Sequence, residues 1–221
     1  MIDVKVIARN FLNLLYPLHC IGCQTPLEAM NELHLCGHCI ASINHNAMPP
    51  FELDDLPALA YSACLYDGAL KELIHSFKYK GKTALAGIFS GLMIDYIGEN
   101  PEIAAVDLIT VVPLHKKRLK EREFNQSLLL AGPVSKKFAI PLINTLEKTR
   151  STRYQNELLK NERLKNLRGA FGVSPKADIK DKNILLIDDI MTTGSTLGEC
   201  AKTLLNGGAG CVKCFTLARG I

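Results

Sequence analysis

Two apolar runs without regular polar alternation are the clearest pattern in the chain. One begins at Asn183 and continues through Ile184 to Ile187, and the other covers residues 107–112 and ends at Pro113. Runs of this length are typical of strands that are buried on both faces of a parallel sheet. The spacing of apolar residues predicts two further strands and two helices, over residues 58–66, 211–217, 69–79 and 83–97. The pattern therefore indicates an α/β domain built on a parallel sheet.

The first of these runs leads into a loop that combines carboxylates with hydroxyl groups. Asp188 and Asp189 follow Ile187, and residues 192–196 read Thr-Thr-Gly-Ser-Thr where a helix is expected to begin. N–H groups at a helix N-terminus can seat a phosphate, and acidic residues at the end of such a strand can bind vicinal hydroxyls. The loop therefore predicts a site for a ribose 5-phosphate. An ordinary helix cap is the alternative, but a cap needs only one of these groups.

The same stretch, residues 185–196, resembles the phosphoribosyl pyrophosphate (PRPP) loop of type I phosphoribosyltransferases. The resemblance implies that Asp188 and Asp189 take the ribose 2- and 3-hydroxyls and form the catalytic pair. The other implied PRPP-binding residues of the loop, mostly around the 5-phosphate, are Met191, Thr192, Thr193, Gly194, Ser195 and Thr196. The implied chemistry is displacement of pyrophosphate from ribose C1 by a nucleophile, with Mg²⁺ on the pyrophosphate.

Four cysteines near the N-terminus have the spacing of a structural zinc site. They form two Cys-x-x-Cys pairs, Cys20 with Cys23 and Cys36 with Cys39. Four thiolates in this arrangement can surround one Zn²⁺ ion as a tetrahedron. A disulfide pair and a redox pair are the alternatives, but cysteines in a reducing cytosol more often bind metal. The remaining cysteines are assigned to packing: Cys64, Cys200, Cys211 and Cys214.

We expect the chain to have two parts. Residues 1–48 hold an N-terminal helix and the zinc module, which is too short to build a core and depends on its metal to fold. Residues 49–221 hold the phosphoribosyltransferase-like domain, and residues 46–55, which include Pro49 and Pro50, are the linker between the two parts. No apolar run approaches the length of a membrane span, and no secretory signal is apparent. The sequence therefore predicts a cytoplasmic protein without a membrane span.

After the four cysteines come, in order, Tyr66-Asp67-Gly68, Val112-Pro113-Leu114, Phe124-Asn125-Gln126 and the loop at residues 185–196. With these motifs in this order, nearly the whole chain resembles the ComF/GntX family, the competence protein F group. The resemblance implies a type I phosphoribosyltransferase fold, an open and mainly parallel sheet flanked by helices, with a small N-terminal four-cysteine zinc module. It further implies PRPP contacts outside the loop from Arg122, Asn125, Gln126, Gln155 and Arg163. One position departs from the family, because Glu123 stands where a glycine is usual. A glycine there would permit unusual dihedrals and close backbone approach to pyrophosphate.

Two basic segments accompany these motifs. Residues 115–122 follow the strand that ends at Pro113, so their cations either meet the pyrophosphate of PRPP or are a solvated helix start. Residues 148–168 carry seven Lys or Arg residues and resemble the mobile loop of amidophosphoribosyltransferase relatives, which closes over PRPP. Gln155 and Arg163 are the residues of this segment expected to reach the ligand.

Two classes of function fit the sequence. The first is a phosphoribosyltransferase of ComF type, implicated by resemblance in natural competence and DNA uptake, with an acceptor that the sequence does not identify. The second is a non-enzymatic, PRPP-sensing factor that binds single-stranded DNA and competence proteins during transformation. A net charge of +4 and a pI of about 8.6 are below the level typical of a dedicated DNA-binding domain. Turnover and oligomeric state are both left open by the sequence.

Overall fold

The computed structural model describes residues 18–27, 35–45, 49–53, 56–150 and 167–220. They divide into two compact units. The N-terminal unit comprises the described parts of Met1–Asn44 and Asp67–Leu85, and the sheet unit comprises those of His45–Tyr66 and Ala86–Ile221. Contacts thus place residues 67–85 with the N-terminal unit, although the sequence alone assigned them to the main domain. The expected N-terminal helix lies outside the described residues, and no described helix is long and apolar enough to cross a membrane.

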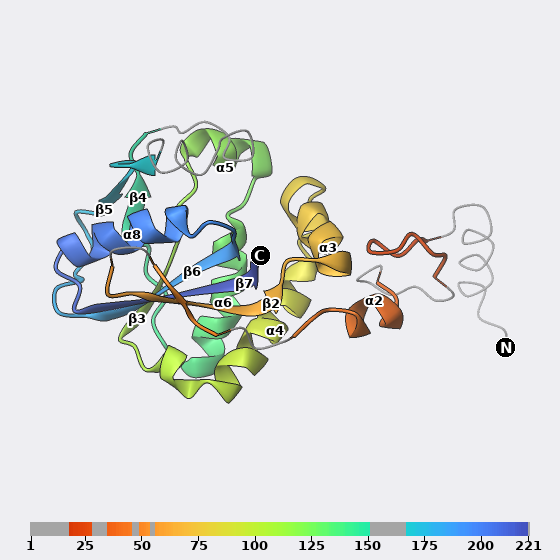
Figure 1. Cartoon of the computed structure of the whole chain (residues 1–221). Coiled ribbons are helices and arrows are strands. Elements are labelled where there is room, and N and C mark those ends of the chain that lie inside the picture. The colour runs from red at the N-terminus through yellow and green to blue at the C-terminus, as the bar shows by residue number, and fades with distance from the viewer. Residues whose placement is uncertain (1–17, 28–34, 46–48, 54–55, 151–166, 221) are drawn as a thin grey trace, which may run out of the picture. The chain divides into compact units, whose positions relative to one another are not determined.

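The sheet unit is built on a five-stranded sheet with the order β1-β2-β7-β6-β3 (Figure 1). Its strands are β1 (Phe51–Glu52), β2 (Leu59–Leu65), β3 (Leu108–Val111), β6 (Asn183–Met191) and β7 (Cys211–Arg219). β1 runs antiparallel to β2, and all other neighbours in this sheet are parallel. The expected mainly parallel sheet is confirmed, and the two uninterrupted apolar runs form the adjacent strands β6 and β3.

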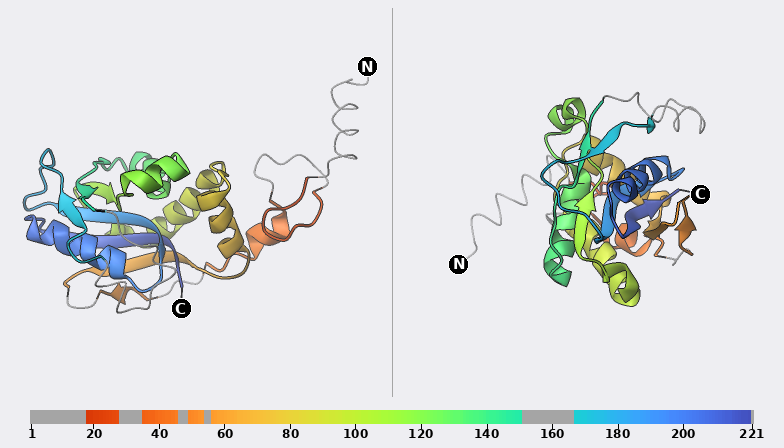
Figure 2. Two further views of the ribbon diagram at one scale, coloured as in Figure 1. Left: turned by 90° about the horizontal axis from the view of Figure 1, so that it is seen from above. Right: turned by 90° about the vertical axis from the view of Figure 1, so that its left-hand side faces the viewer.

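Helices cover both faces of this sheet (Figure 2). Helix α8 (Ser195–Asn206) packs on the face that carries Ile184 and Leu186. Helices α4 (Leu85–Glu99) and α6 (Gln126–Phe138) lie on the other face, where Tyr96 of α4 stacks on Phe215 of β7 with ring centroids 5.6 Å apart. Because Ile184 and Leu186 are fully buried, each stabilises the fold by roughly 1.5–3 kcal/mol. The burial explains why β6 has no polar alternation before Asp188.

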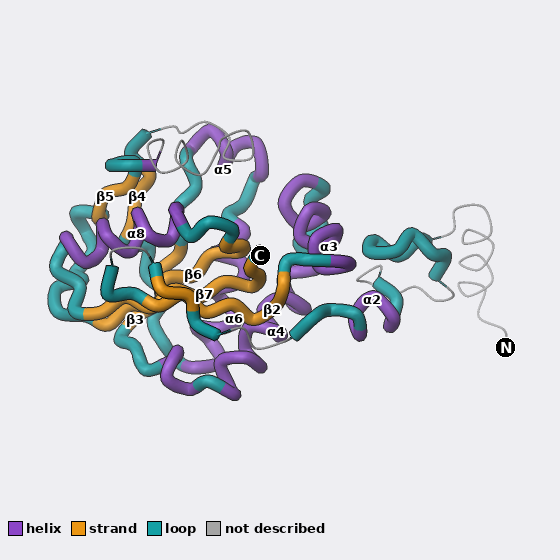
Figure 3. The backbone as a smooth tube through the Cα atoms, in the orientation of Figure 1, coloured by secondary structure: helices purple, strands orange, loops and turns teal. Residues whose placement is uncertain are grey.

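A separate antiparallel hairpin consists of β4 (Leu146–Lys148) and β5 (Phe171–Val173) (Figure 3). Lys148 pairs with Phe171 at the end of the hairpin from which the chain continues into the second basic segment. Most of that segment, residues 151–166, lies outside the described residues, and with it lie Gln155 and Arg163. The hairpin was not predicted from the sequence, because three-residue strands show no readable period.

The first basic segment forms a helix of its own, α5 (Lys116–Arg122). His115 caps it, since the Lys117 N–H donates to His115 Nδ1 at 3.3 Å. The helix ends at Glu123, and α6 begins three residues later. The sequence predicted basic residues leading into a single helix, whereas the structure has two helices separated by a short turn.

The N-terminal unit contains α2 (Gly37–Ala41) and α3 (Gly68–Tyr79). Leu70, Leu73, Ile74 and Phe77 form the buried stripe of α3, as the amphipathic pattern predicted. Helix α2 is one short turn that Cys36 caps and that contains Cys39. The described part of this unit therefore consists of the amphipathic helix α3 and a cysteine-rich segment with little regular structure.

Candidate functional site

The carboxyl end of β6 brings the acid pair and the hydroxyl loop together. Asp188 and Asp189 are the sixth and seventh residues of the nine-residue strand, and α8 begins at Ser195. Asp188 is half-buried and Asp189 is buried. Because successive strand residues point to opposite faces, the two carboxylates leave the strand in different directions. In open parallel sheets, ligands bind outside this end of the strands.

The loop after β6 offers hydroxyl and N–H groups at the start of a twelve-residue helix. Thr193 Oγ1 and Ser195 Oγ lie 2.8 Å apart within hydrogen-bond distance. Thr192 is exposed, while Thr193 and Thr196 are half-buried. Met191 differs from its neighbours, because its side chain is buried in the core and its carbonyl accepts the N–H of Gly220 at 2.9 Å.

Two features of this loop favour glycine at position 194. Its φ of +74° lies in the left-handed region, and no side chain caps α8 in its place. A Cβ at this position would lie 3.1 Å from Leu53 Cδ2 and 3.4 Å from Phe51 Cε1. Strand β1 and the residue after it therefore cover the back of the loop, and a side chain at position 194 would press against them.

A serine that the sequence did not single out contacts the acid pair. Ser127, in the first turn of α6, donates its hydroxyl proton to Asp188 Oδ1 at 2.8 Å, and the Asp189 N–H donates to the same oxygen at 2.9 Å. Ser127 is 3% exposed. Its place directly after Phe124-Asn125-Gln126 was the only available signal, since the bond joins positions 61 apart in the chain.

The turn between α5 and α6 holds the three residues expected to bind pyrophosphate. Arg122 Nη1 donates to Gln126 Oε1 at 3.2 Å, and Asn125 Nδ2 donates to the Val112 carbonyl at 3.2 Å. Gln126 is 1% exposed, and its Nε2 has no hydrogen-bond partner in the described structure. The turn thus lies at the carboxyl end of β3, next to the end of β6.

Glu123 occupies the left-handed region, with φ +65° and ψ −16°. Left-handed backbone costs a residue with a Cβ roughly 1–2 kcal/mol, and glycine avoids this cost but loses more entropy on folding. We therefore expect Glu123→Gly to raise the free energy of unfolding by about 0.5–1 kcal/mol in urea denaturation. Glu121→Gly, which removes the same charge inside α5, should lower it by a similar amount. Equal destabilisation by both changes would contradict a strained Glu123.

Lys148 is a second residue near the acid pair that the sequence did not single out. Its ammonium lies 5.1 Å from the centroid of the Phe171 ring, in the hairpin. Burial, together with the positive charge of Arg118, lowers the pKa of Lys148 to about 8, while the negative charge of Asp188 opposes this shift. An anion bound beside it would favour the protonated form. Lys148 thus provides a partly desolvated cation whose charge interacts with that of Asp188.

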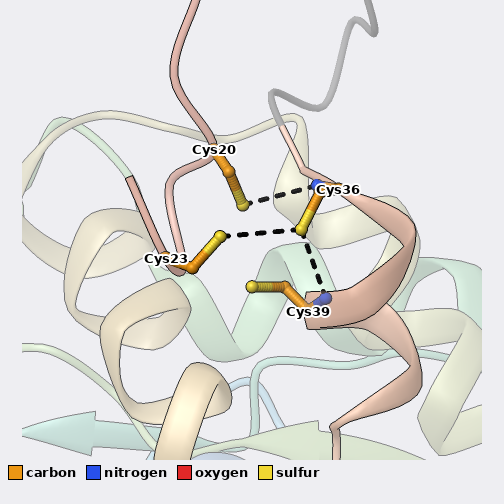
Figure 4. Close-up of side chains that lie close together, drawn as sticks. All are labelled: Cys20, Cys23, Cys36 and Cys39. Carbon is orange, nitrogen blue, oxygen red and sulfur yellow. Dashed lines mark hydrogen bonds between the residues drawn. The ribbon is translucent and has the colours of Figure 1, made fainter. Parts of the chain in front are cut away.

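The four cysteines of the N-terminal unit converge on one point (Figure 4). Their sulfur atoms all lie within 4.8 Å of one another, and those of Cys23 and Cys36 are 3.6 Å apart. A tetrahedral zinc ion with Zn–S bonds near 2.3 Å would place its sulfurs about 3.8 Å apart. Among the described residues no cysteine forms a disulfide. The cluster therefore has the donors and spacing to hold a metal ion.

Local hydrogen bonds prepare these sulfurs for a cation. The Cys36 N–H donates to Cys20 Sγ and the Cys39 N–H donates to Cys36 Sγ, each at 3.4 Å. Hydrogen bonds from the Thr25 hydroxyl and N–H lower the pKa of the Cys23 thiol to about 6. Burial raises the pKa of the Cys39 thiol, and the neighbouring sulfurs add to the rise. Full ionisation of four adjacent thiols therefore needs a cation between them.

Comparison with known proteins agrees with the fold and with the loop. The phosphoribosyl transferase domain family matches residues 125–221. DNA utilization protein YhgH of Escherichia coli K12 is 29% identical over 200 residues, which are 89% of this chain and 82% of that protein. Competence protein F of Haemophilus influenzae is 28% identical over 208 residues, 90% of each.

Competence protein ComFC of Bacillus subtilis is 32% identical over 160 residues, which are 72% of this chain and 63% of that protein. The fold, the loop and these similarities together show that the chain belongs to the ComF/GntX family, the competence protein F group of proteins with a phosphoribosyltransferase domain.

Proposed function

We propose that the sheet unit binds PRPP at the carboxyl end of β6 and transfers its phosphoribosyl group to an acceptor. The observation that carries the proposal is the placement of Asp188 and Asp189 at the end of a central parallel strand, directly before the loop that opens α8. Carboxylates accept hydrogen bonds from vicinal hydroxyls, and a helix N-terminus favours a phosphate. A ribose 5-phosphate presents both groups on one small molecule.

Each part of the site then has a role. Asp188 and Asp189 hold the ribose hydroxyls, and the loop of Thr192, Thr193, Gly194, Ser195 and Thr196 holds the 5-phosphate, with Met191 contributing main-chain atoms only. Arg122 and Gln126, which are hydrogen-bonded to each other beside the turn after β3, are proposed to meet pyrophosphate. Gln155 and Arg163, outside the described residues, are proposed to close over the ligand. Excluding water in this way strengthens the electrostatic stabilisation of a departing anion.

We further propose one metal ion in each unit. Mg²⁺ takes carboxylate and phosphate oxygens while keeping several waters, so the acid pair and the pyrophosphate of PRPP are suitable ligands. When bound, Mg²⁺ would neutralise charge on the pyrophosphate as it leaves. In the N-terminal unit we infer a structural Zn²⁺ on Cys20, Cys23, Cys36 and Cys39, since closed four-thiolate sites are characteristic of zinc. We expect the protein to act in the cytoplasm.

A non-enzymatic role is the second candidate, favoured by helix α5. Lys116, Lys117 and Lys120 are exposed on this helix, and Arg118 is half-buried. Exposed lysines contact nucleic-acid phosphates without sequence preference. The relatives are named for DNA utilization and for competence. In this role the chain would sense PRPP and bind single-stranded DNA, with competence proteins as further partners.

Pyrophosphate release separates the two candidates. The full chain would be incubated with PRPP, Mg²⁺ and a panel of nucleobases and amines, and released pyrophosphate would be measured against the Asp188→Ala/Asp189→Ala protein as background. We expect release that depends on one class of acceptor. PRPP binding without release, combined with salt-sensitive binding of single-stranded DNA, would support the second candidate instead. Failure to bind PRPP would contradict both.

A further inference from the structure

A chain of hydrogen bonds leads from the end of the neighbouring strand β3 to Asp188 of the acid pair. Val112, just after β3, accepts a hydrogen bond from Asn125 Nδ2 at 3.2 Å. Asn125 Oδ1 in turn accepts the Ser127 N–H at 3.0 Å, and the Ser127 hydroxyl donates to Asp188 Oδ1 at 2.8 Å. Every link is between groups of the sheet unit. The chain therefore joins the ends of β3 and β6 through the first turn of α6.

Both ends of the Asn125 amide already form hydrogen bonds within the protein. Its amide nitrogen is used by the Val112 carbonyl, and its amide oxygen caps α6 through the Ser127 N–H. An N-cap of this kind stabilises a helix by about 1 kcal/mol. Turning the Asn125 amide toward pyrophosphate would break both bonds. These two hydrogen bonds give Asn125 a structural role, whereas the family resemblance alone implies that it contacts PRPP.

Ser127 has the geometry to orient a carboxylate. It is 3% exposed, so its hydroxyl does not exchange partners with bulk water. The ionised Asp188 carboxylate can only accept hydrogen bonds, and Oδ1 already receives two donors, the Ser127 hydroxyl and the Asp189 N–H. Two donors on one oxygen fix the rotation of the carboxylate about its terminal bond. A group held in this way does not have to be ordered when the ligand arrives.

We propose that Ser127 is a positioning residue that fixes the Asp188 carboxylate for the ribose hydroxyls, and that Asn125 acts through Ser127 rather than on the ligand. The inference rests on the proposed function, because it assigns the ribose hydroxyls to Asp188. It predicts that the contribution of Ser127 appears only with ligands that carry a ribose. Binding of inorganic phosphate, which needs only the loop before α8, should not depend on Ser127.

The test compares ribose 5-phosphate with inorganic phosphate by calorimetric titration of the full chain. Ser127→Ala should weaken ribose 5-phosphate binding about tenfold, as expected for the loss of one hydrogen bond to a charged group, and should leave phosphate binding unchanged. Ser135→Ala is the matched control, because it removes a hydroxyl of the same helix that donates to the Ile140 carbonyl at 2.6 Å. It should bind both ligands as the wild type does.

Coupling to Asp188 distinguishes positioning from a general loss of structure. In an Asp188→Asn background, Ser127→Ala should cause no further loss of ribose 5-phosphate affinity, because the group that it orients has already been changed. Asn125→Ala provides a second variant should Ser127→Ala fold poorly. Asn125→Ala keeps the Ser127 hydroxyl but removes the side chain that supports Ser127. The loss of affinity should therefore be smaller than in Ser127→Ala, and it should also be confined to ribose 5-phosphate.

The failure of this inference can be told apart from failure of the proposed function. Wild-type binding of ribose 5-phosphate with unchanged affinity in Ser127→Ala would overturn the positioning role and leave the proposed function standing. An equal loss for phosphate and ribose 5-phosphate would also overturn it, since the effect would then be structural. Absence of any ribose 5-phosphate binding by the wild type would overturn the proposed function and the inference together.

Discussion

Replacing Asp188 and Asp189 together by alanine is expected to abolish PRPP binding and leave the fold intact. Each lost hydrogen bond to a charged group costs about 1.5–3 kcal/mol, so two such losses weaken binding by more than about 100-fold. The fold should survive, because the four apolar residues that pack β6 into the sheet, Ile184 to Ile187, remain unchanged. Equilibrium dialysis with labelled PRPP and Mg²⁺ measures the affinity, and urea denaturation measures the stability.

The matched control for this variant is Asp95→Ala/Asp178→Ala. Asp95 and Asp178 are both exposed and lie outside the end of β6, so the control changes net charge equally without touching the loop. It should bind PRPP with wild-type affinity. Similar losses in the two double variants would show a general effect of charge, and an unchanged affinity in the Asp188→Ala/Asp189→Ala protein would remove the acid pair from the site.

Cys20→Ser or Cys36→Ser is expected to release the metal and unfold the cysteine segment of the N-terminal unit. Cys20 is fully buried, and the Cys36 sulfur also caps α2 by accepting the Cys39 N–H. Structural zinc supplies roughly 10 kcal/mol or more of folding free energy in small modules of this kind. The zinc content measured by elemental analysis should therefore fall from one ion per chain to background. Proteases should also cleave the cysteine segment faster than in the wild type.

Cys211→Ser is the corresponding control, because Cys211 lies in β7 and is no part of the cluster. It should retain zinc at the wild-type level. Alkylation adds a second measurement: the four clustered thiols should resist modification until a chelator removes the metal. A wild-type protein that contains no metal, or whose clustered thiols react at once, would contradict the zinc site and favour a redox pair.

The parts of the fold that the sequence predicted correctly are those with a repeating local pattern. β6 and β3 are buried on both faces, so their apolar runs are continuous, and α3 has one buried stripe and therefore a helical period. The loop after β6 is also local, since its acids, hydroxyls and Gly194 are consecutive. Cysteine spacing was similarly sufficient to predict which four sulfurs would meet.

Features that join distant positions could not be predicted in the same way. Ser127 contacts Asp188 across 61 positions, and Phe51 lies against Gly194 only because β1 extends the sheet past β2. Lys148 was not among the residues of the second basic segment that were expected to reach the ligand, yet a hairpin buries part of it. Glu123 is intermediate: the usual glycine indicated an unusual backbone, and the structure has a positive φ there.

The most direct test of the central claim is a calorimetric titration of PRPP with Mg²⁺ into the wild-type full chain. The account predicts saturable binding of one PRPP per chain, weakened when Mg²⁺ is omitted, and competition by ribose 5-phosphate at the same site. Absence of binding, or binding that ribose 5-phosphate does not displace, would contradict a PRPP site at the carboxyl end of β6.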